Sequence, residues 1–545
     1  MGFASMAAHF ILLVRGGGFF MKRLLGLGFL LSVLFVSAAF GDVIVRMKAP
    51  KVVPGTVSTA GAESARTMAA TMTAAGAGGM VVKVYENLVL DGEVLALMRP
   101  VGDEKAFAEA LAKDANVGGV AFDRPIYGTG AEIAAKRANN FNTEMIDAPL
   151  ADVDVSGQVV YVLDTGIDSQ GPLGHLIDYS LSRAYLDEPG DAGMPEWQDY
   201  NGHGTFVSSV AVADGKLDVT GVTPGARVAA MKVMGVNKKG STNFIVDALN
   251  DIAGHQFEGV RAINMSLGYF FPNTPEEIAA GRMAGGGYDP VYFALEAMDK
   301  QDRFVFVTSA GNENLPVGKP VERGGDGWDA GEYVYPGSYI GLKGLITVGS
   351  VNKDGSASDF SNYSGEFVHF QAPGKGIVGY GSGTSRGGFD ELVLFGKGTS
   401  MSSPHIAGMV AALSAKDPGL GAAAIIEKMT RSTKAAPAMK SNGEPLSKYG
   451  TPSLAKAAGI DPAGPGNPDA PDTPDPGVPG TPDVEPPADP FPLPGPNPNL
   501  PWNPEPTPPS VPIEGEGGSG CDAGLGWGCA ALGAALTMRR RWGKF

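Results

Sequence analysis

Three runs of apolar or small residues in the chain predict buried elements. One polar residue stands directly after the first run, and one stands at the start of each of the other two. Residues 159–163 (VVYVL) are apolar throughout, which is typical of a strand buried in a parallel sheet and ending at Asp164. The apolar and small residues after His203 predict a helix that begins at or just after this histidine. The small residues from 402 to 415 predict a buried helix that is entered near Ser400.

Asp164, His203 and Ser400 are the residue types that a serine hydrolase needs. A serine hydroxyl is a weak nucleophile at neutral pH, so acyl transfer needs an imidazole that takes its proton and a carboxylate that orients the imidazole. Asp164 would lie at the carboxyl end of a strand, where open α/β sheets hold their sites. Ser400 would lie near the N–H groups of a helix N-terminus, which favour negative charge. Taken singly, each residue is explained as well by a turn, a tight glycine path or a helix cap, so only the combination points to catalysis.

Further blocks of sequence make this combination specific. With the order Asp164, His203, Ser400, the chain from about residue 145 to 458 resembles the subtilisin (subtilase, peptidase S8) family of serine endopeptidases. The blocks are GVTPGARVAAMKVMG (221–235), INMSLGY (263–269), FVFVTSAGNEN (304–314), YPGSYIGLKGLITVGSV (335–351) and DFSNYSGEFVHFQAPG (359–374). The resemblance implies a subtilisin-like α/β fold, with a mainly parallel central sheet and helices on both faces, preceded by a small α+β propeptide domain.

The resemblance also implies a role for each site residue. Ser400 would be the nucleophile, His203 the general acid and base, and Asp164 the group that orients the histidine. Asn312 would donate its side-chain N–H to the oxyanion, and an asparagine rather than an aspartate here implies activity at neutral to alkaline pH. Six residues would bind substrate: Ser266, Leu267 and Gly268 through extended pairing with its backbone, and Ser309, Ala310 and Gly311 as one wall of a side-chain pocket. No side-chain preference follows from these residues.

The first 135 residues predict two processed segments. Residues 1–41 read as a secretory signal peptide, because residues 21–41 have a basic start, an apolar run and small residues; in that case Met21 is an alternative start. Residues 42–135 hold four strand candidates, the last of them GGVAFDRPIY (118–127), and one amphipathic helix candidate at 104–114. They faintly resemble the subtilase propeptide, which assists folding and inhibits the enzyme until it is removed. The alternative is an unrelated N-terminal domain.

The cut that removes the propeptide is expected between Pro125 and Ile146, ahead of a peptidase domain at residues 136–460. Residues 461–520 are a Pro/Gly-rich linker, which should act as a semi-rigid spacer rather than as a ligand for another domain. Residues 521–545 combine a short apolar segment with terminal arginines and resemble a bacterial sorting signal, processed at the surface near Cys521. The alternative for this segment is a small disulfide loop between Cys521 and Cys529.

Composition narrows the expected partners. A net charge of -16 argues against nucleic acid, and the only two cysteines lie in the C-terminal tail, so the enzyme domain has no disulfide. No histidine stands at metal-ligand spacing and no cofactor is required, although the resemblance brings an expectation of structural Ca2+. The expected partners are protein or peptide substrates, the propeptide as inhibitor, and the membrane or cell surface, for a monomeric enzyme. Two other classes stay open on the same scaffold: a catalytically silent surface adhesin, and an esterase or amidase.

Overall fold

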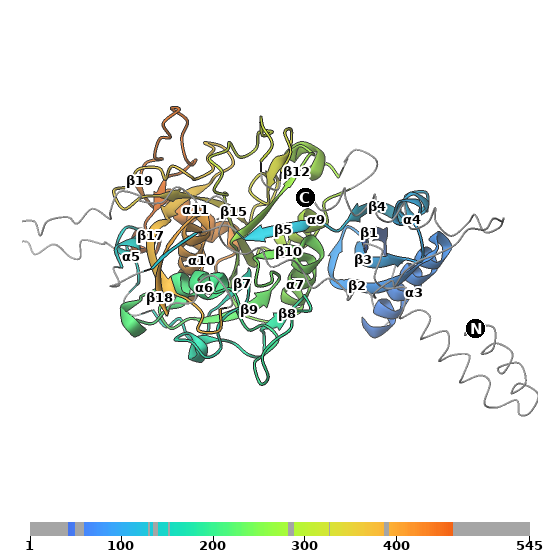
Figure 1. Cartoon of the computed structure of the whole chain (residues 1–545), viewed down its shortest axis with the longest axis horizontal. Coiled ribbons are helices and arrows are strands. Elements are labelled where there is room, and N and C mark those ends of the chain that lie inside the picture. The colour runs from blue at the N-terminus through green and yellow to red at the C-terminus, as the bar shows by residue number, and fades with distance from the viewer. Residues whose placement is uncertain are drawn as a thin grey trace, which may run out of the picture. The chain divides into compact units, whose positions relative to one another are not determined.

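A central sheet of seven strands organises the computed structural model (Figure 1). The structure describes residues 42–49, 59–128, 131–134, 140–150, 153–281, 288–325, 328–385 and 392–460. In sheet order the strands are β16 (Phe370–Pro373), β15 (Leu345–Val351), β13 (Phe304–Ser309), β11 (Arg261–Met265), β7 (Val159–Asp164), β9 (Arg227–Lys232) and β8 (Arg183–Ala184). Every neighbouring pair in this sheet is parallel. The predicted parallel sheet is therefore confirmed.

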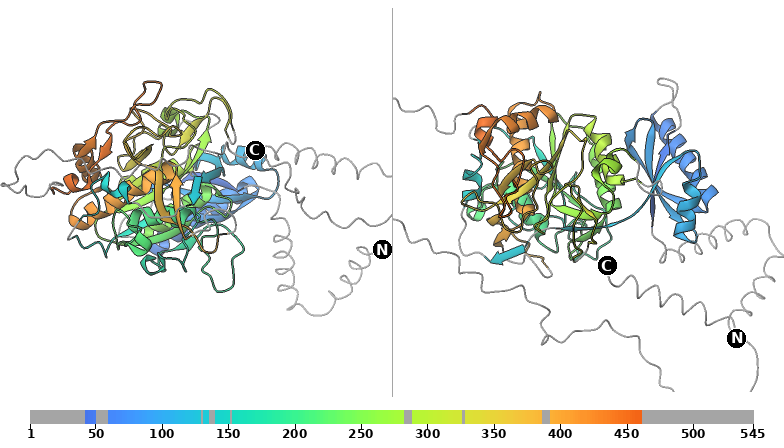
Figure 2. Two further views of the ribbon diagram at one scale, coloured as in Figure 1. Left: turned by 60° about the vertical axis from the view of Figure 1, so that its left-hand side comes forward. Right: turned by 90° about the horizontal axis from the view of Figure 1, so that it is seen from above.

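Both faces of this sheet are buried under helices. In β7, Tyr161 and Leu163 belong to one hydrophobic cluster, and Val160 and Val162 belong to another. Because successive side chains of a strand point to opposite faces, an unbroken apolar run is what a doubly covered strand requires. Helices α7 (Thr242–Gly254) and α9 (Pro290–Asp299) cover the first face; α6 (His203–Val212), α10 (Thr399–Lys416) and α11 (Ala422–Arg431) cover the second (Figure 2).

Smaller elements surround the central sheet. Two antiparallel groups of strands lie beside the site described below, in the orders β10-β5-β12-β14 and β17-β18-β6. Their strands are β5 (Pro125–Gly128), β6 (Ala131–Ala134), β10 (Lys239–Ser241), β12 (Leu267–Phe271), β14 (Tyr333–Tyr335), β17 (Lys375–Tyr380) and β18 (Val393–Lys397). The other short elements are α5 (Phe141–Glu144), α8 (Pro275–Ala279), α12 (Leu454–Ala457), β19 (Thr433–Ala435), β20 (Thr451–Pro452) and the 3-10 turns Gly174–Leu176 and Lys216–Asp218.

The segment before residue 123 forms its own antiparallel sheet. Its strand order is β2 (Gly79–Leu90), β3 (Glu93–Pro100), β1 (Val43–Lys48) and β4 (Val117–Phe122). Helices α3 (Thr59–Ala77) and α4 (Glu104–Leu111) pack on one face, and the other face joins the cluster that contains α7 and α9. The predicted α+β architecture and the helix at 104–114 are confirmed. Helix α3 was not predicted, because its alanine-rich sequence has no distinct apolar stripe.

The prediction of one strand over residues 118–127 is wrong. The structure divides this segment into β4, in the N-terminal sheet, and β5, which pairs with β10 and β12 of the peptidase part. The break falls at Asp123, whose carboxylate accepts hydrogen bonds from the N–H of Asn243 and the hydroxyls of Ser241 and Thr242 at the start of α7. A carboxylate committed to a helix N-terminus ends the strand, and the apolar pattern does not reveal it.

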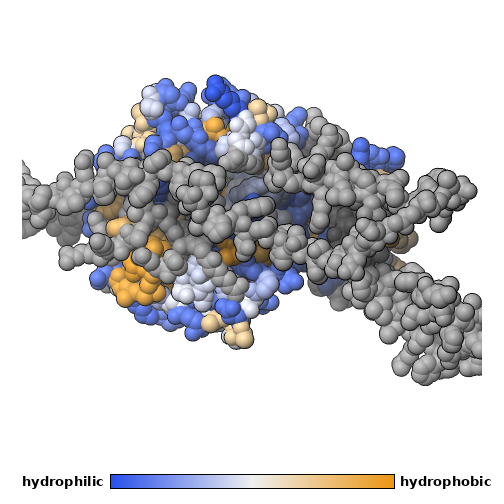
Figure 3. Space-filling view, viewed as in Figure 1, coloured by the Kyte–Doolittle hydropathy of each residue, from blue (hydrophilic) through white to orange (hydrophobic). Residues whose placement is uncertain are grey.

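Several predicted segments lie outside the described residues, namely the signal peptide (1–41), the linker (461–520) and the tail (521–545) with Cys521 and Cys529. Among the helices that the structure describes, none is both long and apolar enough to span a membrane. The described surface on the face shown in Figure 3 is mostly hydrophilic, with hydrophobic residues in small patches.

Candidate active site

The predicted site residues come from the carboxyl ends of three adjacent strands and from two helix starts. Strand β7 ends at Asp164, β11 leads into Ser266, and β13 leads into Asn312; these strands are neighbours in the order β13-β11-β7. Helix α6 begins at His203, and α10 begins one residue before Ser400. The helix starts predicted at the histidine and the serine are both confirmed. Parallel strands bring their carboxyl ends to one edge, which is where open α/β sheets place ligands.

Asp164 and His203 form a fully buried pair. The Nδ1 atom of His203 lies 2.8 Å from Oδ1 of Asp164, and neither side chain is exposed to solvent. The same Oδ1 accepts a 2.7 Å hydrogen bond from the backbone N–H of Thr165, which fixes the carboxylate. Because an ionised carboxylate only accepts hydrogen bonds, Nδ1 carries the proton and Nε2 is the basic nitrogen. This is the tautomer that a general base needs.

A second buried aspartate, Asp199, holds the start of α6. Its Oδ1 accepts hydrogen bonds from the backbone N–H groups of Asn201 and Gly202 and from the hydroxyl of Thr165. Its Oδ2 accepts from the N–H and hydroxyl of Thr205, at 2.9 and 2.7 Å. Asp199 therefore links the turn after Asp164 to the turn before His203. This role of Asp199 was not predicted from the sequence. An aspartate placed two and three residues before the backbone N–H groups that it binds, just ahead of a helix, is the pattern that could have indicated it.

Ser400 is tied to the loop between β11 and β12. Its hydroxyl donates to the carbonyl of Ser266 at 3.3 Å, and the hydroxyl of Ser266 donates to the carbonyl of Ser400 at 3.0 Å. Helix α10 packs against α6, so the serine and histidine helices are held together. The preceding Gly398 has a φ of +142°, in the region that favours glycine, which lets the chain turn sharply into α10. Ser400 is fully buried in this form of the chain.

Asn312 is oriented by the residue next to Ser400. Its Oδ1 accepts hydrogen bonds from the N–H of Thr399 at 2.8 Å and from the Thr399 hydroxyl at 3.0 Å. With its oxygen held in this way, the side-chain nitrogen is the donor that remains for another ligand. The neighbouring Glu313 carboxylate accepts from the N–H of Asn312 at 2.9 Å, and burial raises the pKa of Glu313.

The residues predicted to bind substrate lie on both sides of Ser400. Leu267 and Gly268 begin β12 and pair with Gly128 and Tyr127 of β5. Ser309 is the last residue of β13, and Ala310 is buried directly after it. Gly311 has a φ of +102°, and a Cβ there would lie 2.2 Å from Nδ2 of Asn362, so only glycine fits. The structure thus brings all six residues to the same edge of the sheet as Asp164 and Asn312.

His405 does not belong to this constellation. It lies in α10, fully buried, with Nδ1 2.8 Å from the carbonyl of Met401 and Nε2 2.9 Å from Nδ2 of Asn142. A carbonyl can only accept, so Nδ1 is protonated and the neutral ring accepts from the amide. Burial lowers the pKa of His405 from 6.5 to about 4. These hydrogen bonds are those of a structural histidine rather than a second base.

Protonation of His405 should make the fold sensitive to acid. Between pH 6.5 and about 4 the unfolded chain takes up a proton here that the folded chain does not, so stability present above pH 6.5 is lost as the pH falls to about 4. The loss from this group is about 3 kcal/mol. In a Ser400→Ala background, His405→Gln should show a shallower fall in the free energy of urea unfolding between pH 7 and pH 4. Equal slopes with and without His405 would contradict this.

The described residues hold no cluster of ionisable side chains that would bind a metal ion. Among them, no group of three or more His, Cys, Asp and Glu side chains is arranged to hold one. His175, for example, lies 2.7 Å from Asp214 and 2.9 Å from the ammonium of Lys216, which makes a surface cluster of mixed charge. Calcium also binds backbone and amide oxygens, so structural Ca2+ stays an expectation from the resemblance.

The fold and this site define a serine hydrolase of the α/β class, and comparison with known proteins identifies the family. The sequence model of the Subtilase family (Peptidase_S8) matches residues 155–453, more than half of the chain. The chain therefore belongs to the subtilase family, and it is a subtilisin-family serine endopeptidase. The N-terminal sheet and the strands β5 and β6 precede the residues that the family model matches.

Two curated relatives agree with this assignment. The intracellular serine protease of Paenibacillus polymyxa is 32% identical over 277 residues, which cover 49% of this chain and 70% of that protein. Subtilisin Savinase of Lederbergia lenta is 28% identical over 264 residues, covering 48% of this chain and 78% of that protein. Among solved structures, a cold-adapted subtilisin-like serine proteinase matches 58% of this chain and 98% of its own, with 22% identity and a TM-score of 0.42.

Proposed function

We propose that this chain is the precursor of a secreted, cell-surface-directed endopeptidase that acts through Asp164, His203 and Ser400. The hydroxyl of Ser400 attacks a peptide carbonyl while Nε2 of His203 takes its proton, and Asp164 holds the resulting imidazolium. The carbonyl oxygen becomes an anion, which the Asn312 amide and a backbone N–H near Ser400 stabilise. The imidazolium then protonates the leaving amine, and an acyl ester remains on Ser400. Water, deprotonated by His203, hydrolyses this ester and restores the serine.

One observation carries the preference for peptides as substrates: an extended segment of the chain itself already lies beside Ser400. Strand β5 is held between β10 and β12, antiparallel to both. The N–H of Gly128 donates to the carbonyl of Lys238 at 2.9 Å, in addition to the pairing of Tyr127 with Gly268. Strand addition of this kind recognises the backbone of a polypeptide, which a small ester does not offer. This favours an endopeptidase over an esterase or amidase.

The chain on the other side of the site supports a precursor arrangement. Strand β6 pairs with β18, and Ala131 is opposite Lys397, three residues before Ser400. Gly128 is thus paired with β12, next to Ser266, and Ala131 is paired with β18, close in sequence to Ser400. We infer that the bond cut during maturation lies between Gly128 and Ala131. This lies within the range expected from sequence and slightly before the proposed domain limit at residue 135.

The N-terminal sheet has its own contacts with the peptidase part, as an inhibitory propeptide needs. Lys83 of β2 forms a 2.6 Å ion pair with Asp247 of α7. Nearby, the backbone N–H of Asn87 donates to Oδ1 of Asn250 at 3.1 Å, and the Asn87 amide donates to the carbonyl of Asn250 at 3.0 Å. Apolar residues of the sheet, including Tyr85, are in the same cluster as α7. Full burial of Ser400 in this form fits an inactive precursor.

Sequencing the N-terminus of the active enzyme tests the proposal. When the full chain is expressed and the caseinolytic fraction is purified, the mature N-terminus should lie at residue 129, 130 or 131. The released fragment, added back in excess, should inhibit casein hydrolysis, because it carries both β5 and the sheet that contacts α7. Active enzyme that still begins at Asp42 would overturn the propeptide proposal.

Secretion and attachment to the surface are further parts of the proposal. They are supported by the signal-like residues 21–41 and by the sorting-signal-like residues 521–545. A cell fractionation that finds the active enzyme on the surface, without its terminal arginines, would agree with them. Intact C-terminal peptides in the culture medium would count against surface attachment. A surface adhesin remains the second candidate only if the enzyme hydrolyses neither casein nor peptides.

A further inference from the structure

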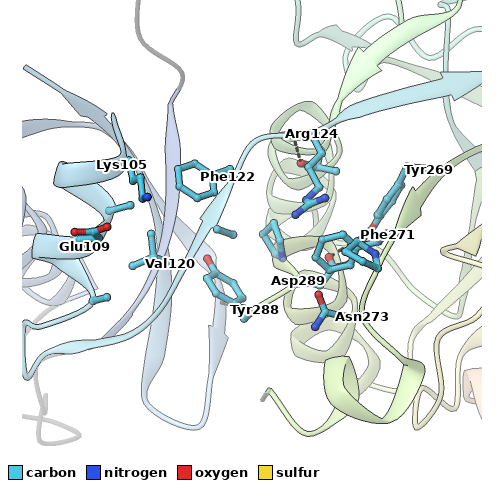
Figure 4. Close-up of a pocket in the computed structure, with 16 residues that line it drawn as sticks. Lys105, Glu109, Val120, Phe122, Arg124, Tyr269, Phe271, Asn273, Tyr288 and Asp289 are labelled. Carbon is cyan, nitrogen blue, oxygen red and sulfur yellow. Dashed lines mark hydrogen bonds between the residues drawn. The ribbon is translucent and has the colours of Figure 1, made fainter. Parts of the chain in front are cut away.

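We propose that the face of the peptidase part that holds Arg124 is a distal substrate subsite for an arginine side chain. The inference rests on the proposed function, because it takes β5 as the occupant of the substrate strand. Arg124 directly precedes β5, four residues before Gly128. Arg124 is one of the residues that line a cavity of about 450 Å³, and its side chain reaches toward Phe271 and Asp289 (Figure 4).

The backbone of Arg124 is fixed by Thr242 at the start of α7. Its N–H donates to the Thr242 hydroxyl at 3.0 Å, and its carbonyl accepts from the Thr242 N–H at 2.7 Å. Pro125 follows and restricts the backbone at Arg124 to extended conformations. The two hydrogen bonds use only backbone atoms of the bound segment. A substrate that binds like β5 and extends one residue further toward its N-terminus can make the same two hydrogen bonds. The side chain of that extra residue then points in the direction of the Arg124 side chain.

The guanidinium of Arg124 stacks on an aromatic ring of the substrate strand. Its Cζ lies 3.7 Å from the ring centroid of Phe271, the last residue of β12. A planar guanidinium over a ring at this distance gains both cation–π attraction and dispersion, and a lysine ammonium does not stack in this way. The contact therefore selects arginine over other long side chains.

A buried carboxylate supplies the charge that this subsite needs. Asp289 is 5% exposed and caps α9, and it accepts from the hydroxyls of Tyr269 at 3.1 Å and Tyr339 at 2.8 Å. Burial lowers the pKa of Arg124, whereas the negative charges of Asp289 and Glu332 raise it. The helix start and two tyrosines fix this carboxyl near the position of Arg124, and burial raises the pKa of Asp289, so a nearby cation is needed to keep it ionised.

Removal of the propeptide would leave this subsite open. The cavity has one wall from the N-terminal part, including Lys105, Glu109 and Phe122, and another from the peptidase part, including Phe271 and Asp289. Only the first wall departs with the propeptide. The second wall stays and contacts the substrate residue at the position of Arg124. This position is two residues before that of Ile126, which is fully buried. A preferred substrate therefore carries an arginine two residues before an apolar residue, on the N-terminal side of the cut.

Peptides that differ at one position test the subsite without altering the enzyme. The mature enzyme, obtained from the full chain, is given the peptide AFDRPIYGTGAEIA (residues 121–134) and the same peptide with Arg124→Gln or Arg124→Lys. We expect kcat/KM to fall about tenfold for the glutamine peptide, mainly through KM, and by a smaller factor for lysine. Equal kcat/KM for the three peptides, with cleavage intact, would overturn the subsite and leave the proposed function standing.

A matched pair of enzyme variants locates the preference. Phe271→Leu should bring the ratio of kcat/KM between the arginine and glutamine peptides close to one, whereas Tyr179→Leu, at an exposed aromatic residue, should keep the ratio of the wild type. The ratio is measured within one preparation, so a smaller folded fraction does not change it. A preference that persists in Phe271→Leu would overturn the assignment to this face. If neither the peptides nor casein is cleaved, the proposed function and the subsite fail together.

Discussion

Replacing Ser400 with alanine in the full chain should abolish proteolysis and leave the precursor uncut. The hydroxyl that attacks the carbonyl is lost, while the buried pair of Asp164 and His203 stays in place. The expected loss in kcat is about a millionfold, which is the size found for the nucleophile of subtilisin itself. Casein hydrolysis and the mass of the N-terminal fragment should be followed side by side, with the wild type as reference.

The matched control is Ser403→Ala, one turn further along α10. The hydroxyl of Ser403 lies 2.9 Å from that of Ser266, so the change removes a buried hydroxyl from the same helix without removing the nucleophile. This variant should still mature and should retain most of its activity. If Ser400→Ala matured like the wild type, either another group would be the nucleophile or another protease would cut the chain. In the second case the adhesin alternative would gain support.

Removing the amide of Asn312 should slow turnover strongly while leaving substrate affinity nearly unchanged. The N–H is needed only when the carbonyl oxygen becomes an anion, so the effect falls on kcat rather than on KM. The expected loss is about a hundredfold to a thousandfold, the magnitude measured for the corresponding donor in subtilisin. Steady-state kinetics on one peptide substrate, with active-site titration, measure both constants.

Two substitutions separate stabilisation of the oxyanion from a structural role. Asn312→Asp keeps an oxygen for the N–H and hydroxyl of Thr399 but has no N–H to donate, whereas Asn312→Ala loses both functions. Both variants should lose at least a hundredfold in kcat if the donated N–H matters. A large loss in the alanine variant alone would mean that Asn312 acts by positioning Thr399 at the start of α10.

The sequence predicted the parts of the fold that depend on unbroken apolar runs and on ordered motifs. The run at 159–163 predicted a buried strand ending at Asp164, and the small residues around His203 and Ser400 predicted two helix starts; all three are observed. These elements were predictable because local pattern and tertiary burial agree there. The roles of Asp164, His203, Ser400 and Asn312 are predictions that the activity measurements above test.

Features that depend on long-range contacts could not be predicted in the same way. The break at Asp123 depends on hydrogen bonds to residues about 120 positions later, at the start of α7. The position of Arg124 on Phe271 depends on the chain leaving the N-terminal sheet after β4 and pairing with β12 as β5. The role of Asp199 depends on two turns, one after Asp164 and one before His203, that meet at its carboxylate. In each case the partners are distant in sequence, so no pattern of neighbouring residues contains the information.

The proposed self-cleavage between β5 and β6 would have a consequence for the kinetics of maturation. Because the bond to be cut belongs to the same molecule as the nucleophile, its effective concentration is set by the fold and not by the amount of protein. The first cut should therefore be first order and unaffected by dilution. After it, the N-terminal part is a separate molecule whose occupancy follows mass action. If the enzyme is secreted and the N-terminal part inhibits it, as proposed, dilution outside the cell would release the inhibitor. The contacts between the two parts would then depend on concentration only after the chain has been cut.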